Sequence, residues 1–405
     1  MAGPVTRRRV RGSTQDDVRR HNLGAILTEV HRHGCRSRAE LTAEMGLNRS
    51  TIGDLVSELV DAGLVLERSA SARGRAGRPS LEVVPRPEAA YVLAIDLGVR
   101  HMVVARVGLG GQVLDRVEAD PGRDWSDLDT TVDAIVETSG LLREGAPDGG
   151  RCFGVGLSVP GVVRLNDGLL RFAPNLGWID QPLGARLGER LDLPAFLAND
   201  ADLGALAEHW RGAAVGYEHV VVISGEIGLG GGILIGGRPL RGRGGYAGEI
   251  GHLRVNPNGR LCRCGSVGCL ETETGVESLL IAAGRPADGG LEVYRAVLAE
   301  VAAGEPKAMA AAARVARWLG IGVGMLVNTF NPDIVVLGGP LGELFVLTED
   351  VVRESVARST LVAPREQVRM AASGLGSDAQ LIGAAELAFA PLLEDPIGVL
   401  TSLAA

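Results

Sequence analysis

The sequence is poor in cysteine and lacks segments that would direct it out of the cytoplasm. Only five cysteines occur among the 405 residues, and no basic start is followed by an apolar stretch of the signal-peptide type. A disulfide framework is therefore disfavoured, because such frameworks belong to oxidising compartments. No apolar run is long enough to cross a bilayer, and low-complexity segments and short repeats are absent. These absences predict a cytoplasmic protein with no membrane partner.

The chain as a whole also lacks the excess of basic residues that is typical of proteins binding nucleic acid, since its net charge is -8. The charge is unevenly distributed, however. Residues 1–80 contain 14 arginines against 9 acidic residues, or +5, whereas the remainder carries -13. This asymmetry indicates a basic, DNA-facing module attached to an acidic body. Solubility alone could account for the acidic body, so the basic end is the informative part.

Three of the five cysteines lie in one short segment together with a histidine. The four residues are His252, Cys262, Cys264 and Cys269. Three cysteines and one histidine form a ligand set for tetrahedral structural zinc, and Gly265 and Gly268 allow the tight turn that two of the thiolates need to reach one ion. A disulfide pair and chance clustering are the alternatives. We expect structural zinc.

Three helices are predicted near the start of the chain. The first has apolar residues at helical spacing at Leu23, Ile26, Leu27 and Val30. Ser37 and Glu40 form a capping box, so a second helix begins at about Arg38. Gly46 ends this helix, and Asn48 then caps a third helix that Gly63 terminates. The third helix has a buried face made of Ile52, Leu55, Val56 and Leu59.

Two short helices around a glycine turn indicate a helix-turn-helix, whose second helix enters the major groove by its first residues. Arg49, Ser50 and Thr51 are the DNA-facing candidates, and Gly53 and Asp54 are further candidates. A strand and a wing containing Arg73, Arg75 and Arg78 follow, and such arginines fit a narrow minor groove or phosphates. A small three-helix bundle without DNA binding is the alternative.

The first twenty residues are rich in arginine, with Arg7, Arg8, Arg9 and Arg11 close together. They predict a flexible basic arm that touches phosphates. A cloning remnant or a wrongly assigned start would look the same.

The metal segment resembles a known family. Its pattern, Glu-x-Gly-His followed by Cys-x-Cys-Gly-x-x-Gly-Cys-Leu-Glu, is similar to the zinc-and-sugar segment of the ROK family, which joins bacterial sugar kinases to sugar-responsive repressors. The resemblance covers roughly residues 90–390, and residues 21–68 resemble the repressors' amino-terminal extension. It implies an α/β protein in which a winged helix-turn-helix precedes a two-lobed body with the actin-like ATPase or sugar-kinase (ribonuclease H-like) fold.

The resemblance also implies an order of domains along the chain. The expected segments are a basic arm (1–20), a winged helix-turn-helix (21–83), a first lobe (91–198), a second lobe with the zinc segment (199–378) and a closing helix that returns to the first lobe (379–398).

The resemblance implies a sugar site between the two lobes. Matching the family's motifs residue by residue gives sugar contacts at Asn175, Asn199, Asp200, Glu249, His252 and Glu271. In kinases of the family, the aspartate at position 200 is the general base that takes a proton from the attacking hydroxyl. Capping of the helix that begins there is the alternative for Asp200.

Both expected phosphate loops depart from the pattern of the kinases. The first contains Asp96 and Gly98 followed by Val99 and Arg100, where kinases carry Asp-x-Gly-Gly-Thr, so a glycine amide and a hydroxyl are lost.

The second phosphate loop contains Gly228 and Gly230, preceded by Glu226 and Ile227 where kinases carry Gly-Thr. A carboxylate repels a triphosphate, and isoleucine donates no hydrogen bond. ATP and Mg²⁺ are therefore not expected to bind.

These features together predict a sugar-responsive transcriptional regulator, a repressor of carbohydrate-metabolism genes. A sugar bound across the cleft would favour one lobe angle and one spacing of paired DNA-binding domains on an operator. Because helix-turn-helix proteins bind paired half-sites, a homodimer or tetramer is expected. The alternatives are an active ATP-dependent hexose kinase resembling glucokinase, with Asp200 as its base, and a zinc-stabilised interaction domain without ligand.

Overall fold

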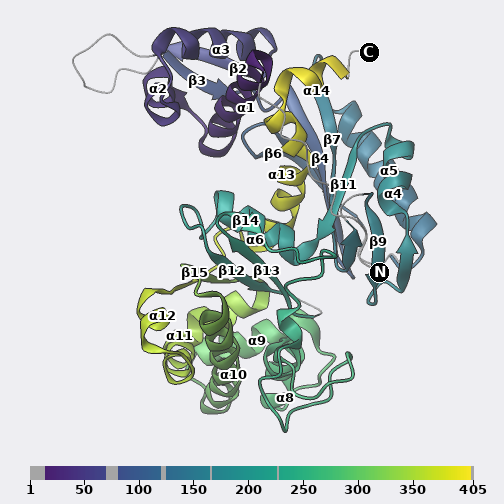
Figure 1. The fold of residues 1–405 in the computed structure, drawn as a ribbon. Coiled ribbons are helices and arrows are strands. Elements are labelled where there is room, and N and C mark those ends of the chain that lie inside the picture. The colour runs from purple at the N-terminus through teal and green to yellow at the C-terminus, as the bar shows by residue number, and fades with distance from the viewer. Residues whose placement is uncertain (1–13, 70–80, 120–124, 165–166, 226–227, 403–405) are drawn as a thin grey trace, which may run out of the picture.

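The computed structural model describes residues 14–69, 81–119, 125–164, 167–225 and 228–402. Three units follow one another along the chain (Figure 1). The first is a small amino-terminal unit, and the other two are lobes that are each built on a five-stranded sheet. The fold is a winged helix-turn-helix followed by a two-lobed α/β body of the sugar-kinase type.

The amino-terminal unit packs three helices against a three-stranded sheet of order β1-β3-β2. Its elements are α1 (Gln15–His33), β1 (Arg36–Ser37), α2 (Arg38–Met45), α3 (Arg49–Asp61), β2 (Val65–Ser69) and β3 (Leu81–Pro85). The two predicted caps are present: the Ser37 hydroxyl accepts from the Glu40 amide at 3.2 Å, and the Asn48 side chain accepts from the Thr51 amide at 2.8 Å. The apolar residues predicted at helical spacing are buried in the core of this unit.

Helix α1 begins at Gln15, which corrects the expectation of a helix from Leu23 preceded by a flexible arm. Thr14 and Asp17 form a capping box, in which the Asp17 amide donates to the Thr14 hydroxyl at 3.2 Å and the Thr14 amide to the Asp17 carboxylate at 2.8 Å. The first turns of α1 are polar, so apolar periodicity did not reveal them. Positions 7–11 of the arm and the wing residues Arg73, Arg75 and Arg78 lie outside the described residues.

The first lobe is built on a sheet of order β11-β7-β4-β5-β6. Its elements are β4 (Ala90–Leu97), β5 (Met102–Gly108), β6 (Gln112–Glu118), α4 (Leu128–Glu144), β7 (Arg151–Val159), β8 (Val162–Arg164), β9 (Leu169–Ala173), β10 (Trp178–Gln181), α5 (Leu183–Leu191) and β11 (Ala195–Asn199). Leu93 and Ile95 of β4 join the core beneath α4 and α5, whereas Val92 and Ala94 join the core on the opposite face, because alternate strand residues face opposite sides.

The second lobe is built on a sheet of order β14-β13-β12-β15-β16. Its elements are α6 (Asp200–Arg211), β12 (Val220–Ser224), β13 (Gly230–Ile235), β14 (Arg238–Pro239), η1 (Ile250–His252), α7 (Leu270–Thr274), α8 (Val276–Ala282), α9 (Gly290–Ala302), α10 (Pro306–Phe330), β15 (Ile334–Leu337), α11 (Gly339–Ser359), α12 (Val362–Gln367) and β16 (Arg369–Ala372). Helices α10 and α11 share a core with one face of this sheet, and α6 shares a core with the other.

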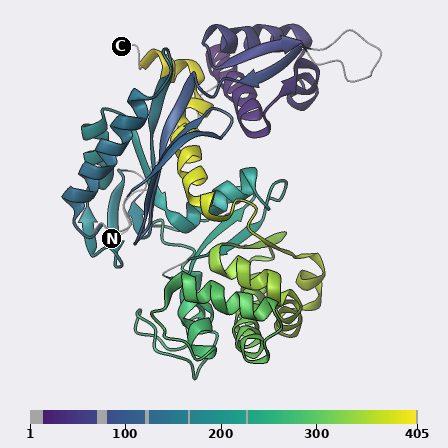
Figure 2. The ribbon, with the colours of Figure 1, turned by 180° about the vertical axis from the view of Figure 1, so that it is seen from behind.

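After β16 the chain returns to the first lobe through η2 (Gly376–Asp378) and α13 (Ala379–Glu394). Helix α13 lies on the face of the first sheet opposite α4 and α5, and it also touches α6 and α1 (Figures 1 and 2). The helix ends at Glu394, earlier than the expected residue 398, because Pro396 starts a separate helix, α14 (Pro396–Ser402).

Helix α10 is long and apolar enough to cross a membrane by length and composition, which corrects the expectation that no such run exists. Its most apolar window is 61% buried within the structure, where it packs against α11, α7, α8 and α9. The apolar character of α10 therefore reflects its place in the core of the second lobe.

Gly156 of β7 lies directly against α13. A Cβ added there would lie 1.8 Å from the Ala384 carbonyl oxygen, so Gly156→Ala must displace the helix. We expect the free energy of unfolding to fall by about 1–3 kcal/mol, measured as a lower thermal midpoint. Gly140→Ala in α4 is the control, because no heavy atom lies within 4 Å of the added Cβ. A midpoint for Gly156→Ala equal to that of the wild type would contradict this packing.

Candidate functional site

The four predicted metal ligands come together in one cluster. His252 lies on η1, and Cys262, Cys264 and Cys269 lie in the loop that leads into α7. One ligand atom of each residue lies within 4.8 Å of all the others. The Nδ1 atom of His252 lies 3.7 Å from the Cys262 sulfur, and the Cys264 and Cys269 sulfurs are also 3.7 Å apart. Four such donors at this spacing fit a single tetrahedral metal ion.

The thiols of the cluster differ in acidity. Burial raises the pKa of Cys269 to about 12 and also raises the pKa of Cys262, whereas hydrogen bonding from the Ser266 backbone lowers the pKa of Cys264. A metal ion must displace protons from such thiols, so its affinity for the cluster must fall at acidic pH.

A buried carboxylate outside the ligand set holds the metal loop in shape. Glu273 is 5% exposed; it accepts a hydrogen bond from the Asn256 side chain at 3.0 Å and one from the Arg260 amide at 3.1 Å. These bonds fix the loop between η1 and α7 independently of the sulfur atoms. Sequence reasoning missed Glu273, because nothing in the sequence distinguishes it from the neighbouring Glu271.

The first turn of α6 carries Asn199 and Asp200 into the cleft between the lobes. Asn199 is the cap of this helix: its side-chain oxygen accepts from the Ala201 and Asp202 amides at 2.9 and 3.3 Å. Its side-chain NH₂ donates to the Gly161 carbonyl of the first lobe at 3.0 Å. One N–H of this group is left over and could reach a sugar hydroxyl. Asn199, and not Asp200, is therefore the residue that caps α6. The Asp200 carboxylate is not needed for capping.

Asp200 is half-buried. Burial and the nearby Asp96 together raise the pKa of Asp200 to about 7, while the Ala201 amide, which donates to the carboxylate at 2.9 Å, opposes the shift. A carboxyl group with a pKa near neutrality can accept a proton from a hydroxyl group. Asp200 therefore retains the chemistry of a general base.

A neighbouring carboxylate, Asp202, faces a small pocket of about 40 Å³ between the lobes. Asn199 and Glu249 also line this pocket. Burial raises the pKa of Asp202 to about 6, with Arg241 opposing and Glu249 reinforcing the shift. Sequence reasoning did not assign Asp202, although its position three residues after Asn199 places both on one helix face.

The remaining predicted sugar contacts lie around the metal loop. Glu271 accepts a hydrogen bond from the Leu229 amide at 3.0 Å, so it also holds the glycine-rich loop. Asn175 of the first lobe accepts from Arg263, which lies between two of the cysteines, at 3.3 Å. This last contact joins the metal loop to the opposite wall of the cleft.

The first predicted phosphate turn is occupied by a side chain of the protein itself. The His101 ring lies 3.2 Å from the Asp96 carboxylate through Nε2, and a Cβ added to Gly98 would meet this ring at 2.1 Å. The Gly98 amide donates to the His101 carbonyl at 2.9 Å. The Gly98 amide and the Asp96 carboxylate of this expected phosphate turn thus have partners within the protein. Nothing in the sequence pattern had singled out His101.

The glycine-rich segment has a packing reason that does not involve phosphate. Added Cβ atoms at Gly230, Gly231 and Gly232 would lie 2.8, 2.0 and 2.3 Å from Ala201, Ile250 and Ala205 respectively. These glycines let β13 approach α6 and η1. Gly228 lies against Glu271, and Glu226 and Ile227 lie outside the described residues.

The DNA-facing candidates lie together at the start of α3. Arg49, Ser50 and Asp54 are exposed, and Thr51 and Gly53 are half-buried. Ser50 donates a hydrogen bond to the capping Asn48 side chain at 2.7 Å. The structure therefore presents one cationic and several small polar groups at the tip of this helix.

Asp200→Asn should reduce the pH dependence of stability. Because folding raises the pKa of Asp200 from 3.8 to about 7, this carboxyl favours the folded state below pH 4, and that contribution is lost as the pH rises through 7. We expect the unfolding free energy of the variant to fall less between pH 5 and 8, by on the order of 2 kcal/mol. Denaturant titrations at both pH values measure this, with Asp148→Asn on an exposed loop as the control. Identical pH profiles for the Asp200 variant and the wild type would refute the assignment.

Comparison with known proteins places the two-lobed body in one family. The sequence profile of the ROK family matches residues 92–390. A xylose repressor of Caldicellulosiruptor bescii is 29% identical over 89% of this chain and 93% of its own length.

Two solved structures resemble this chain, one over nearly its whole length and the other over about three quarters of it. A ROK family transcriptional regulator described as a homologue of the E. coli MLC protein superposes with a TM-score of 0.80 at 26% identity, covering 96% of this chain and all of its own. A ROK family glucokinase from Streptomyces griseus, solved with glucose and AMPPNP, reaches a TM-score of 0.64 at 30% identity and covers 73% of this chain and 98% of its own. Since the family profile spans both lobes and the regulators match nearly the full length, this chain belongs to the ROK family.

Proposed function

We propose that this chain is a sugar-responsive transcriptional repressor of carbohydrate-metabolism genes. The observation that carries the proposal is the amino-terminal unit that precedes the two-lobed body. The match to the glucokinase covers 98% of that enzyme but only 73% of this chain. Regulators similar to this chain match it with that unit included.

Operator DNA would bind at the start of α3. An exposed arginine followed by small polar residues at a helix amino terminus can enter the major groove and contact base edges or phosphates. The wing arginines Arg75 and Arg78 would add contacts to the minor groove or backbone. Paired half-sites on an operator would require a homodimer or a higher oligomer of this chain in the cytoplasm.

The sugar would bind between the lobes, where Asn199, Asp202 and Glu249 line the pocket. Asp200, His252, Glu271 and Asn175 surround the same region, and paired sugar hydroxyls need acceptors with fixed orientation of this kind. The pocket is small, about 40 Å³. Sugar binding would change the arrangement of the lobes or of the intervening loops around it, and the ligand would select that arrangement.

Zinc is the metal that best suits the cluster of three thiols and one imidazole. His252 would ligate through Nδ1, which faces the Cys262 sulfur, and its Nε2 atom would remain for a sugar hydroxyl. Zinc would supply no reaction chemistry here. Its effect would be to hold the loop that presents His252, Glu271 and Arg263 to the cleft.

An active hexose kinase is the second candidate, and Asp200 favours it because the base is retained with a pKa near 7. The occupation of the first phosphate turn by His101 opposes it, as does the packing role of the glycine-rich segment. If both phosphate contacts are lost, ATP and Mg²⁺ would lack a cradle.

Calorimetric titration with D-xylose, D-glucose, N-acetyl-D-mannosamine and, separately, Mg-ATP tests the choice between these functions. We expect heat from at least one sugar and none from Mg-ATP. An operator duplex selected by the full-length protein from a random library should then show a Kd that changes on addition of that sugar. Tight Mg-ATP binding with phosphorylation of a sugar would instead establish the kinase.

Cys264→Ser should lower the zinc content from about one equivalent per chain to well below it, because one of four ligands is lost. Sugar affinity should fall with it, since the loop carrying His252 and Glu271 loosens. Metal analysis and calorimetry measure the two effects. Cys152→Ser, outside the cluster, is the matched control. Stoichiometric zinc with unchanged sugar affinity would refute the ligand assignment.

Arg49→Ala should weaken operator binding by about 1–3 kcal/mol, because a contact to a base edge or phosphate is removed. Sugar binding should be unchanged, since α3 lies in the amino-terminal unit and not at the cleft (Figure 1). Fluorescence anisotropy with the selected operator measures the first, with Arg353→Ala on α11 as the control. If the operator Kd of Arg49→Ala equals that of the control, this residue does not belong to the reading surface.

A further inference from the structure

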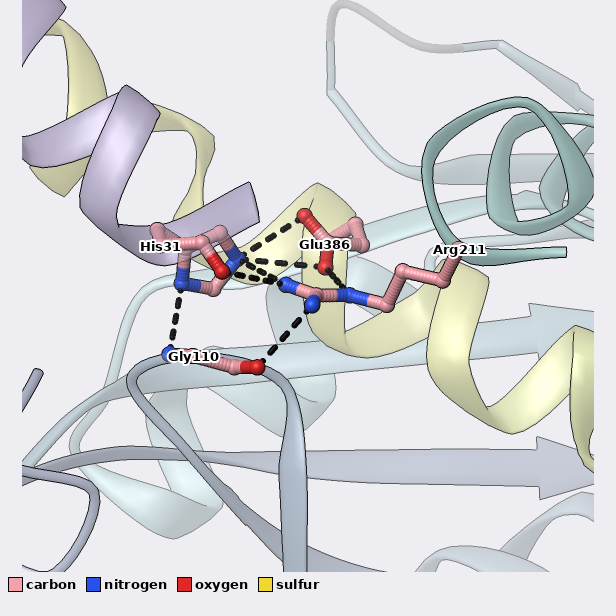
Figure 3. Close-up of polar contacts among 4 residues, drawn as sticks. All are labelled: His31, Gly110, Arg211 and Glu386. Atoms are coloured by element: carbon pink, nitrogen blue, oxygen red, sulfur yellow. Dashed lines mark hydrogen bonds and ion pairs between the residues drawn. The ribbon is translucent and has the colours of Figure 1, made fainter. Parts of the chain in front are cut away.

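The amino-terminal unit is joined to the body through a buried polar cluster of four residues from four elements (Figure 3). His31 belongs to α1, Gly110 to the turn between β5 and β6, Arg211 to the last turn of α6, and Glu386 to α13. His31 is 0% exposed and Glu386 is 1% exposed. The Nε2 atom of His31 lies 3.0 and 3.1 Å from the two Glu386 carboxylate oxygens. A carboxylate buried this deeply requires such partners.

Arg211 ties the cluster together. Its Nε donates to Glu386 at 2.5 Å, its Nη1 to the Gly110 carbonyl at 2.9 Å, and its Nη2 to the His31 carbonyl at 3.1 Å. The Gly110 amide donates to His31 Nδ1 at 2.9 Å. Burial alone would raise the pKa of Glu386, but His31 and Arg211 hold it below its ordinary value. One guanidinium group thus contacts the DNA-binding unit, the first sheet and the closing helix at once.

Packing around the cluster brings the same elements together. The His31 ring lies against Phe389 of α13 with centroids 4.9 Å apart, and the Arg32 guanidinium lies 4.3 Å over the Trp210 ring of α6. A Cβ added to Gly24 of α1 would lie 2.5 Å from the Leu393 carbonyl oxygen of α13. Helix α1 therefore rests on the carboxyl end of α6 and the carboxyl half of α13.

The opposite end of α6 is the cleft. The helix begins directly after Asn199 and carries Asp200 and Asp202 in its first turn. Twelve residues make a rod of about 18 Å. Near its far end, the Glu208 carboxylate accepts hydrogen bonds from the Gly374 and Leu375 amides, both at 3.1 Å, in the segment that leads into α13. Because of these hydrogen bonds, a displacement of α6 would also displace the segment that leads into α13.

We propose that α6 couples the sugar cleft to the DNA-binding unit, and that Arg211 and Glu386 are positioning residues that set the orientation of this unit through His31. The inference rests on the proposed function. Sugar bound at the first turn of α6 favours one position of this helix. Because Arg211 in its last turn contacts His31 and Glu386, the position of α1 changes with it. A coupling free energy between these sites requires that α6 have two positions and that sugar and operator each favour one of them.

His31→Gln in the full-length protein tests the proposal, because it removes the contact of the His31 ring with Glu386 and leaves the Arg211–Glu386 pair in place. The affinities for D-xylose and D-glucose, measured by calorimetry, should stay within about twofold of the wild type. The sugar-induced change in operator Kd, which allosteric coupling commonly places at about 5- to 150-fold, should fall below about twofold. Glu386→Gln, the second variant, should have the same effect from the body side. Glu349→Gln on α11, which loses an exposed ion pair with Arg353, is the matched control.

A sugar-induced change in operator Kd that persists in both variants would overturn the proposal. Hydrogen exchange of α1 provides a readout that needs no ligand. Asn199→Ala loosens the cleft end of α6, and we expect exchange of the α1 amides to rise by about tenfold or more if α6 supports that helix. Unchanged exchange would also overturn the coupling. If the wild type binds neither sugar nor operator, the proposed function fails, and the exchange experiment still decides whether α6 supports α1.

Discussion

The close approach of α13 to its neighbours is the constraint on which the rest of the structure depends. Glycines make it possible: a Cβ added to Gly383 would lie 2.1 Å from the Leu203 carbonyl oxygen of α6, and Gly156 allows the same helix to lie against β7. Helix α13 thus joins the first sheet, the helix that leaves the cleft, and α1. Because protein interiors are close-packed, a displacement of one member of this group must be accommodated by the others.

The cleft shows how a sugar-kinase fold can serve a regulator. Asp200 keeps a carboxyl group with a pKa raised to about 7, and Glu249 lines the pocket between the lobes as an oxygen acceptor. The phosphate side is different, since His101 contacts Asp96 and the glycines of β13 are used for packing against α6. Carboxylates that can accept from hydroxyl groups, beside a first phosphate turn whose Gly98 amide is bonded within the protein, suit recognition of a ligand better than its conversion.

Much of this could be predicted from the sequence. The caps at Ser37 and Asn48 and the spacing of Leu23 to Val30 identified the helices of the amino-terminal unit because local hydrogen bonds and periodicity determine them. The three cysteines indicated the cluster because soft ligands are rare in this chain. The His31, Arg211 and Glu386 contact could not be predicted, since it joins positions as many as 355 residues apart and none of them belongs to a motif. The packing role of Gly230 to Gly232 was likewise invisible, because a glycine required by a neighbouring side chain looks the same in sequence as one required by phosphate.

The position of α13 at the far end of the chain has a consequence for how the protein folds during synthesis. Strands β4 and β7 leave the ribosome long before residues 379–394, yet one apolar face of their sheet is covered by that helix. At about 5–20 residues per second, this face must wait on the order of tens of seconds for its cover. This face of the first sheet therefore stays uncovered until the residues of α13 have been synthesised.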